Sequence, residues 1–360
     1  MKNNLTKKIF TYSLCVLLSA GLNGQQSQAK QTQSKPSKKD IAVMAAALKF
    51  NKDPNSTLFG THDPEIVKQD SVYYLFSTGG GVSSSTDLIN WKREKSVFDK
   101  APEWMSADII PGFRGGTGFW APDVQLINGT YYIYYSYSAG AKVTSAIGVA
   151  TNKTLHPSDP DFKWVDHGMV VQSIPNRDMW NALDANLVMD GRQGWLVFGS
   201  FWGGIQMVKL APDLLSIAKP EVWYHIAGMP RDFVLDWTDP GDGTIEGAFI
   251  YKHIQYFYLF VSLDYCCRGV NSDYNVVVGR SRNVEGPYVD REGKLMSRGG
   301  GTLVAKGNDR WYGVGHNSAF SMNGKSIIVM HGYDKLANGA SKLIIRELKW
   351  DRGDWPSIDL

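Results

Sequence analysis

The sequence has little cysteine, no excess of basic charge in its main part and no long apolar run beyond its first 30 residues. Only three cysteines occur among 360 residues, so a disulfide framework does not hold this fold together. Residues 1–40 contain seven lysines and one acid, which leaves the remainder slightly acidic. That balance argues against a nucleic-acid-binding surface, and no later segment is long and apolar enough to span a membrane.

The N-terminal 40 residues have the pattern of a targeting signal followed by a linker. Lysines precede an apolar run over residues 9–22, and a small-x-small cleavage pattern closes the segment, so residues 1–29 are predicted to be a secretory signal peptide. The alternative is an N-terminal anchor helix, for which the run is short. Residues 30–40 are polar and predict a linker. We expect a secreted protein, periplasmic or at the cell surface, with one folded domain over residues 41–360.

The folded part is rich in aromatic residues and glycine, and it contains a five-fold repeat. With 12 Trp, 17 Tyr, 15 Phe and 37 Gly, the composition favours an all-β protein. Each repeat is a short strand, a polar turn such as Asn128-Gly129 or Asn323-Gly324, and a strongly apolar strand. The repeats begin at Asp63, Ala121, Asp184, Glu246 and His316. Four strands over about 64 residues predict one propeller blade per repeat, and hence an all-β, five-bladed β-propeller. The alternatives are a large β-sandwich or two small β domains.

The outermost strand of each blade is harder to place than the hairpin. Short segments edged by polar turns, such as residues 163–165 and 287–289, are candidates for these strands. Two cysteines, Cys266 and Cys267, lie next to each other in the fourth repeat. Neighbouring cysteines can close only a strained ring, so we expect two small buried residues, and whether they are bonded stays open.

Acidic side chains recur at the first position of the repeats. A propeller places the innermost strands around its axis, so Asp63, Asp184 and Glu246 should converge there together with His316. One such carboxylate could simply accept backbone hydrogen bonds at a strand end. Three in register repel one another and shift each other's pKa values, which structure alone does not require. One protonated and one ionised carboxyl in a pocket with aromatic side chains suit glycoside hydrolysis.

Several longer motifs surround these positions. They are Thr61-His62-Asp63-Pro64, Phe119-Trp120-Ala121-Pro122-Asp123-Val124, Asn181-Ala182-Leu183-Asp184-Ala185-Asn186, Ser200-Phe201-Trp202-Gly203-Gly204 and Ile245-Glu246-Gly247, together with Tyr265-Cys266-Cys267-Arg268-Gly269 and His316-Asn317. Taken together, these motifs resemble glycoside hydrolase family 43 over roughly residues 57–350 and, within it, the endo-1,5-α-L-arabinanases. Leu183 and Ala185 depart from the family's usual Ile and Pro, which affects the backbone more than the chemistry.

The resemblance implies a catalytic mechanism and a substrate. Asp63 would be the general base on water, Glu246 the general acid, and Asp184 would hold Glu246 and raise its pKa. The protein would cleave internal α-1,5-L-arabinofuranosidic bonds of arabinan, a polysaccharide of pectin side chains, with inversion. The alternatives are an exo-acting α-L-arabinofuranosidase or β-xylosidase of the same family, or a non-catalytic glycan-binding propeller.

The resemblance also suggests substrate-binding and metal-binding residues. The substrate-contacting positions would be Trp120, Asn181, Ser200, Phe201 and Trp202. Trp120 and Trp202 could instead belong to the core or to blade packing. His316 would hold an axial metal ion, usually calcium, mostly through waters. Calcium prefers oxygen ligands, so the alternative for His316 is a hydrogen-bonded core histidine.

Overall fold

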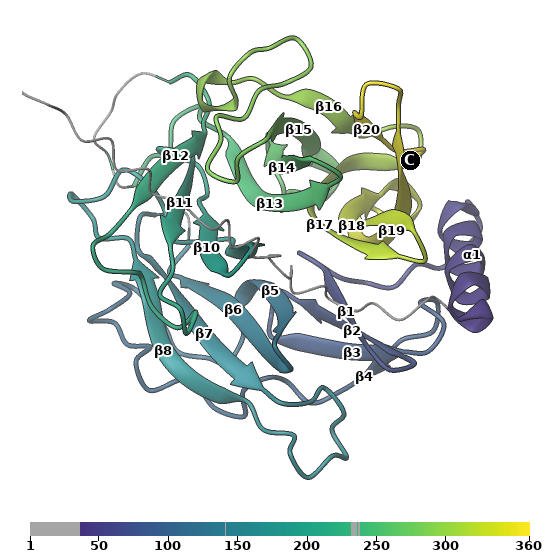
Figure 1. The fold of residues 1–360 in the computed structure, drawn as a ribbon, viewed down its shortest axis with the longest axis horizontal. Coiled ribbons are helices and arrows are strands. Elements are labelled where there is room, and N and C mark those ends of the chain that lie inside the picture. Colours follow the sequence, from purple (N-terminus) through teal and green to yellow (C-terminus); the bar gives the residue numbers. More distant parts are fainter. Residues whose placement is uncertain (1–36, 141, 232–235, 237) are drawn as a thin grey trace, which may run out of the picture. The chain divides into compact units, whose positions relative to one another are not determined.

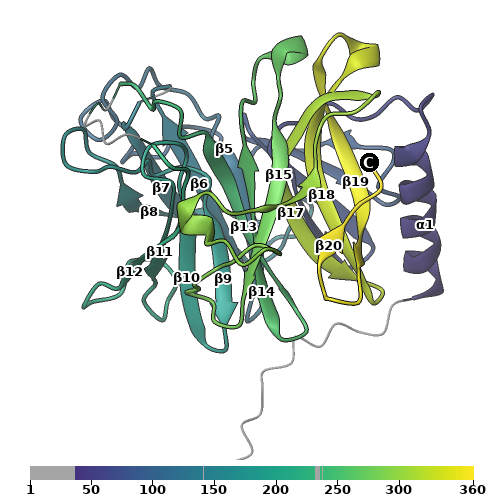
Figure 2. The same ribbon diagram turned by 90° about the horizontal axis from the view of Figure 1, so that it is seen from above.

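The computed structural model describes residues 37–140, 142–231, 236 and 238–360. The predicted signal peptide and the first part of the predicted linker lie outside these residues. Within them, five four-stranded antiparallel sheets are each built from consecutive strands (Figure 1). This arrangement confirms the predicted five-bladed β-propeller. Figure 2, which is turned by 90° from Figure 1, shows that inner strands such as β9 and β13 run roughly parallel to the viewing direction of Figure 1.

The four strands of each blade pair in chain order, and in Figure 1 the labelled first strands β1, β5, β13 and β17 lie nearest the centre. Blade 1 contains β1 (Glu65–Gln69), β2 (Val72–Ser77), β3 (Gly81–Ser85) and β4 (Lys92–Arg93). Blade 2 contains β5 (Trp120–Ile127), β6 (Thr130–Ser138), β7 (Ser145–Asn152) and β8 (Val165–Gln172). Blade 3 contains β9 (Asn186–Asp190), β10 (Gln193–Phe198), β11 (Ile205–Lys209) and β12 (Trp223–Ala227). Blade 4 contains β13 (Ile245–His253), β14 (Tyr256–Leu263), β15 (Asn275–Ser281) and β16 (Thr302–Ala305). Blade 5 contains β17 (Trp311–Met322), β18 (Lys325–Asp334), β19 (Ala340–Trp350) and β20 (Pro356–Ser357).

The hairpins between first and second strands form where the turn residues predicted them. Asn128 and Gly129 have φ values of +50° and +76°, and Asn323 and Gly324 have values of +56° and +76°. Two successive residues with positive φ match the twist of the flanking strands, and Asn-Gly supplies them at low cost. The turn chemistry therefore sets the register of these two inner hairpins.

The outer strand of blade 4 differs from the prediction. Residues 287–289 form no strand, and Val289 makes only isolated bridges to Arg280 and Leu295. The fourth strand is β16, which pairs with β15. Pro287 cannot donate a ladder hydrogen bond, and the blade edge passes to a later segment.

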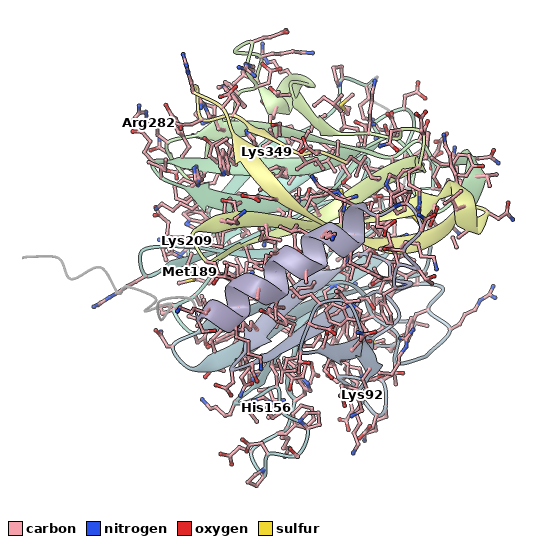
Figure 3. The ribbon with its side chains drawn as sticks, turned by 90° about the vertical axis from the view of Figure 1, so that its right-hand side faces the viewer. Lys92, His156, Met189, Lys209, Arg282 and Lys349 are labelled. Carbon is pink, nitrogen blue, oxygen red and sulfur yellow. A yellow bond between two sulfur atoms is a disulfide. The ribbon has the colours of Figure 1, made fainter. Side chains whose placement is uncertain are left out.

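A helix that the sequence analysis did not anticipate precedes the first blade. Helix α1 (Lys38–Lys52) begins at the cap Ser37, whose hydroxyl accepts a hydrogen bond from the Asp40 amide. Met44 and Ala47 pack into one apolar cluster with side chains of blades 1 and 5, and Figure 3 shows α1 lying across strands of the blades. The helix thus includes residues 38–40, the last three of the predicted linker. The helix covers the seam where the last blade meets the first.

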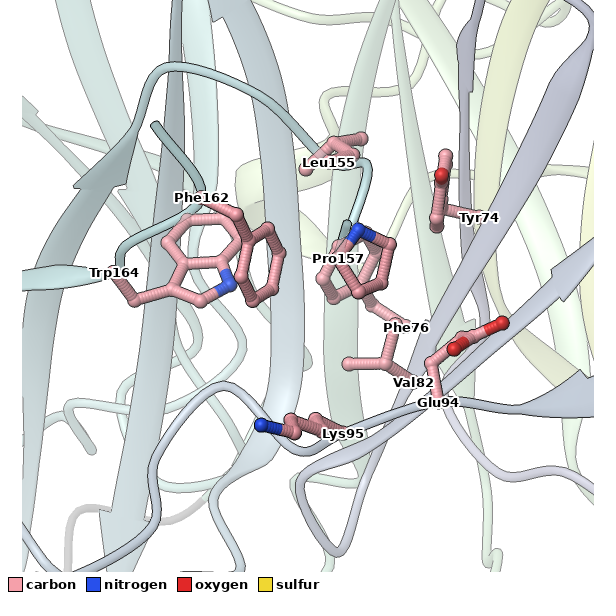
Figure 4. Close-up of a pocket in the computed structure, with 9 residues that line it drawn as sticks. All are labelled: Tyr74, Phe76, Val82, Glu94, Lys95, Leu155, Pro157, Phe162 and Trp164. Atoms are coloured by element: carbon pink, nitrogen blue, oxygen red, sulfur yellow. The ribbon is translucent and has the colours of Figure 1, made fainter. Parts of the chain in front are cut away.

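Apolar and aromatic side chains fill the spaces between blades. Figure 4 shows a small pocket between blades 1 and 2, lined among others by Phe76, Phe162 and Trp164. It contains none of the carboxylates singled out in the sequence. The candidate site therefore lies elsewhere, at the inner strands.

Candidate active site

Five residues with left-handed backbone conformation lie just before or within the inner strands, one in each blade. These ring residues, as we call them, are Asp63 (φ +50°), Ala121 (+42°), Asp184 (+60°), Gly247 (+59°) and His316 (+50°). Such a conformation costs a non-glycine residue roughly 1–2 kcal/mol, and backbone strain of this kind clusters at functional sites. The sequence analysis had placed Glu246 at the fourth position. The structure corrects this by one residue, because Gly247 is the ring residue of blade 4.

Side chains of the preceding blade bind the backbone N–H groups of these ring residues. Thr78 Oγ1 accepts from Ala121 N at 2.8 Å, Ser136 Oγ from Asp184 N at 3.2 Å, Ser262 Oγ from His316 N at 2.8 Å, and His331 Nδ1 from Asp63 N at 3.1 Å. Each acceptor follows the ring residue of its own blade by 15 positions. The same type of hydrogen bond therefore occurs at four of the seams between blades, including the seam that joins blade 5 to blade 1.

At the seam between blades 3 and 4, the hydroxyl group and the N–H group of the ring residue have different partners. Ser200, which follows Asp184 by 16 positions, donates to Glu246 Oε2 at 2.8 Å. The Gly247 N–H, which a hydroxyl would bind at the other seams, is bound by Asp184 Oδ2 at 3.1 Å. The one-residue offset of Glu246 thus brings two carboxylates to one seam.

Three imidazoles surround the carboxylate of Asp63. His62 Nδ1 lies 2.9 Å from Oδ2, while His316 Nδ1 and His331 Nδ1 lie 3.1 Å and 3.5 Å from Oδ1. Thr78 Oγ1 also donates to Oδ2. Burial raises the pKa of Asp63, but the electrostatic interactions of its carboxylate with the His316 and His62 side chains outweigh burial and bring the pKa well below its usual value. Asp63 is therefore suited to remain an anion.

Glu246 and Asp184 have the opposite environment. Burial raises the pKa of Glu246. The electrostatic interaction with His316 and the hydrogen bonds from Ser200 and from Tyr274, whose Oη lies 2.9 Å from Oε1, only partly offset that rise. Burial and then the charges of Glu246 and Asp63 raise the pKa of Asp184 well above its usual value. This pair therefore keeps a proton at a pH where Asp63 has lost its own.

A second layer of buried acids lies on the inner strands. Asp123 accepts from Asn186 Nδ2 at 2.8 Å and from the Leu187 amide at 3.0 Å. Burial raises the pKa of Asp123 to about 6, and burial together with the Asp123 charge raises the pKa of Glu65. Asp123 thereby joins blades 2 and 3.

The predicted substrate-contacting residues separate into two groups. Trp120 is 37% exposed beside the ring residue Ala121, and Ser200 contacts Glu246. Phe201 is half-buried, with its ring centroid 6.0 Å from that of Tyr265. By contrast, Asn181 is only 1% exposed, and its Oδ1 accepts from Ser173 Oγ.

Trp202 also belongs to the interior. It is 4% exposed, and its Nε1 donates to the Asp236 carbonyl at 2.9 Å. The core alternative considered for Trp202 therefore describes its surroundings, whereas Trp120 has a face available to a ligand.

The structure adds functional candidates that the sequence analysis missed. Tyr274 is fully buried, and a Cβ atom at Gly315 would come within 2.1 Å of its ring, so that glycine makes its position possible. No local pattern marks Tyr274. His331 and Thr78, however, could have been found by extending the repeat alignment by 15 residues.

The adjacent cysteines do not match the expected pair of small buried residues. Cys266 and Cys267 form a disulfide, and they are half-buried and exposed respectively. Cys267 Sγ lies 3.6 Å from His62 Nε2, and the Arg268 guanidinium stacks over the Tyr265 ring at 3.5 Å. The loop after β14 therefore borders the carboxylate site.

The donor atoms near the axis limit how a metal could bind. His62, Asp63 and His331 offer ligand atoms within 4.8 Å of one another, but His331 Nδ1 already accepts the Asp63 N–H. His316 directs Nδ1 to Asp63, and no described residue contacts its Nε2. One open imidazole nitrogen fits a hard cation such as calcium only if waters supply the other ligands.

Within the described ranges, no helix is long and apolar enough to cross a bilayer.

Comparisons with known proteins agree on one family. The model of glycosyl hydrolases family 43 matches residues 55–356. An extracellular exo-α-(1→5)-L-arabinofuranosidase of Cellvibrio japonicus is 45% identical over 83% of this chain and 86% of its own length. An extracellular endo-α-(1→5)-L-arabinanase of Bacillus subtilis is 38% identical over 82% and 87%. The structure of a Cellvibrio cellulosa α-L-arabinanase complexed with arabinohexaose superposes with a TM-score of 0.81 at 44% identity, covering 84% of this chain and 96% of that one.

Proposed function

The chain belongs to glycosyl hydrolase family 43, and we propose that it hydrolyses α-1,5-L-arabinofuranosidic bonds of arabinan, the polysaccharide of pectin side chains, with inversion. One observation carries the proposal. At the axis, Asp63 is faced by three imidazoles, while Glu246 and Asp184 share a seam lined by hydroxyl and carboxylate groups. The arabinan-degrading relatives, and the arabinohexaose bound to one of them, support the substrate class.

The chemistry follows from these two environments. Asp63, as the anion, takes a proton from a water whose oxygen attacks the anomeric carbon. Glu246 gives its proton to the glycosidic oxygen as the bond from that oxygen to the anomeric carbon breaks on the opposite face. Asp184 touches neither the water nor the leaving oxygen in this scheme. It binds the Gly247 amide and keeps the pKa of Glu246 high.

The catalytic roles can be tested with matched variants. Asp63→Asn and Glu246→Gln should each lose about 10²–10⁴-fold in kcat while the thermal unfolding midpoint stays near that of the wild type. Asp190→Asn is the control, because it makes the same change at the exposed far end of β9. By NMR, an α-linked substrate should release the β-anomer first. The α-anomer appearing first would replace the single displacement by a covalent intermediate.

Within this reaction we propose endo action, and exo action is the second candidate. The 45% identity to an exo-acting relative, against 38% to an endo-acting one, favours the second. Early products from linear arabinan decide between them, because an endo enzyme releases a series of oligosaccharides and an exo enzyme releases mainly one small product. Activity on xylan oligosaccharides alone would indicate a β-xylosidase. Binding without hydrolysis would indicate a glycan-binding propeller.

We also propose that His316 and waters hold a calcium ion. The Nε2 atom of His316 is open, and waters would supply the oxygen ligands that calcium prefers. When bound, the ion would supply positive charge near the axis. Asp63 would still act as the base, because its oxygens are already held by His62, His316 and Thr78.

Secretion is proposed from the N-terminal pattern and from the extracellular relatives. The protein recovered from a secreting host should begin at Lys30. Retention of residues 1–29 on a membrane-bound product would favour the anchor alternative.

A further inference from the structure

Strand β18 brings two side chains to the back of the Asp63 site. His331 is fully buried, and its Nδ1 accepts the Asp63 N–H at 3.1 Å. A neutral imidazole that accepts at one nitrogen carries its proton on the other. The His331 proton is therefore on Nε2, which lies 3.2 Å from the hydroxyl of Tyr333.

The hydroxyl of Tyr333 contacts several polar groups, the Ser272 side chain among them. Besides His331 Nε2, it contacts the Cys267 backbone N–H at 2.7 Å and His62 Nε2 at 3.0 Å. A phenol oxygen has two lone pairs and one proton. The Cys267 amide and the His331 N–H occupy the lone pairs. The phenol proton is directed to His62 Nε2 at 3.0 Å, because the Ser272 oxygen already accepts from the Arg268 N–H and Cys267 Sγ is a weak acceptor 4.0 Å away.

We propose that Tyr333 is a positioning residue that holds His62 with its proton on Nδ1, 2.9 Å from Asp63 Oδ2. With Nε2 accepting from Tyr333, neutral His62 must carry its proton on Nδ1. That N–H group lies beside the carboxylate oxygen, although its direction misses the line of a hydrogen bond. In the other tautomer a lone pair would face the carboxylate and repel it, so the imidazole would turn away. The inference rests on the proposed role of Asp63 as the base.

The disulfide loop takes part in the same device. Cys267 has φ +67° and presents its amide to Tyr333, while its sulfur lies beside His62. The loop from blade 4 thereby holds a side chain of blade 5 against a histidine of blade 1. Residues of three blades, far apart in sequence, therefore determine which nitrogen of His62 carries the proton beside Asp63.

The tautomer can be read without any substrate. In ¹⁵N NMR spectra of wild-type protein, His62 should show a protonated Nδ1 and an unprotonated Nε2. Burial lowers and the Asp63 charge raises the pKa of His62, with a net rise, so spectra are taken up to alkaline pH to reach the neutral ring. A wild-type His62 with its proton on Nε2 would overturn the proposal outright.

The variant Tyr333→Phe tests the consequence for catalysis. We expect kcat to fall about 10-fold or more, within the ~10²-fold that a misplaced catalytic group costs, with KM nearly unchanged. The His62 proton should shift toward Nε2. Tyr312→Phe, on β17 of the same blade, is the control and should change neither. Wild-type kcat with an unchanged tautomer in Tyr333→Phe refutes the proposal. Full activity of Asp63→Asn would instead refute the proposed base and leave the tautomer result standing.

Discussion

The pH dependence of catalysis should respond to one buried hydroxyl. Tyr274→Phe removes the Oη that donates to Glu246 Oε1 at 2.9 Å, while the ring keeps its fully buried place. That hydrogen bond lowers the pKa of Glu246, so its loss should raise the pKa. A hydrogen bond to a charged group contributes about 1.5–3 kcal/mol. One pKa unit corresponds to about 1.4 kcal/mol, so the expected rise is roughly one to two units.

The assay is the pH profile of kcat on linear arabinan. Its basic limb follows loss of the Glu246 proton in the enzyme–substrate complex, so Tyr274→Phe should move this limb to higher pH. The acidic limb, which follows Asp63, should stay in place. Ser200→Ala removes the donor to Oε2 at 2.8 Å and should move the same limb in the same direction. An unmoved or lowered basic limb in a folded Tyr274→Phe protein would refute Glu246 as the acid.

Three further predictions concern neighbouring groups. Asp184→Asn should lower activity and move the basic limb down, because Asp184 and Glu246 share one proton and the amide removes the negative charge that Asp184 carries when Glu246 holds that proton; an unmoved limb contradicts the modulating role of Asp184. Gly247→Ala would place a Cβ 3.1 Å from His316 Nδ1 at φ +59°, so urea unfolding should show a loss of about 1–2 kcal/mol together with reduced kcat. Gly191→Ala, at φ +61° with open space, should show the stability loss alone. Chelation should lower activity or the unfolding midpoint modestly, and His316→Ala should abolish this response; if chelators leave the wild type unchanged and elemental analysis finds no calcium, His316 serves Asp63 only.

Local sequence patterns determined much of the architecture. Asn128-Gly129 and Asn323-Gly324 specify their hairpins because positive φ at two successive positions is a property of those residues themselves. The alternation of polar turns with apolar strands repeats five times, and it predicted the blades because strand pairing here is between neighbours in sequence. The same five-fold repeat aligned Asp63, Asp184 and Glu246, so these acids could be recognised from the sequence.

Tertiary structure alone decided the packing of the helix, the edge of blade 4 and the environment of the acids. Helix α1 forms against a seam between the first and last blades, which no local pattern reveals. Glu246 differs from Asp63 because it accepts hydrogen bonds from a hydroxyl of blade 3 and from Tyr274 just before β15 of blade 4, while two imidazoles of blade 5 lie within 3.5 Å of Asp63. A carboxyl's pKa depends on the charges and donors within a few ångströms. Those neighbours lie up to 268 residues away along the chain, so only the closed ring of blades could determine which acid holds a proton.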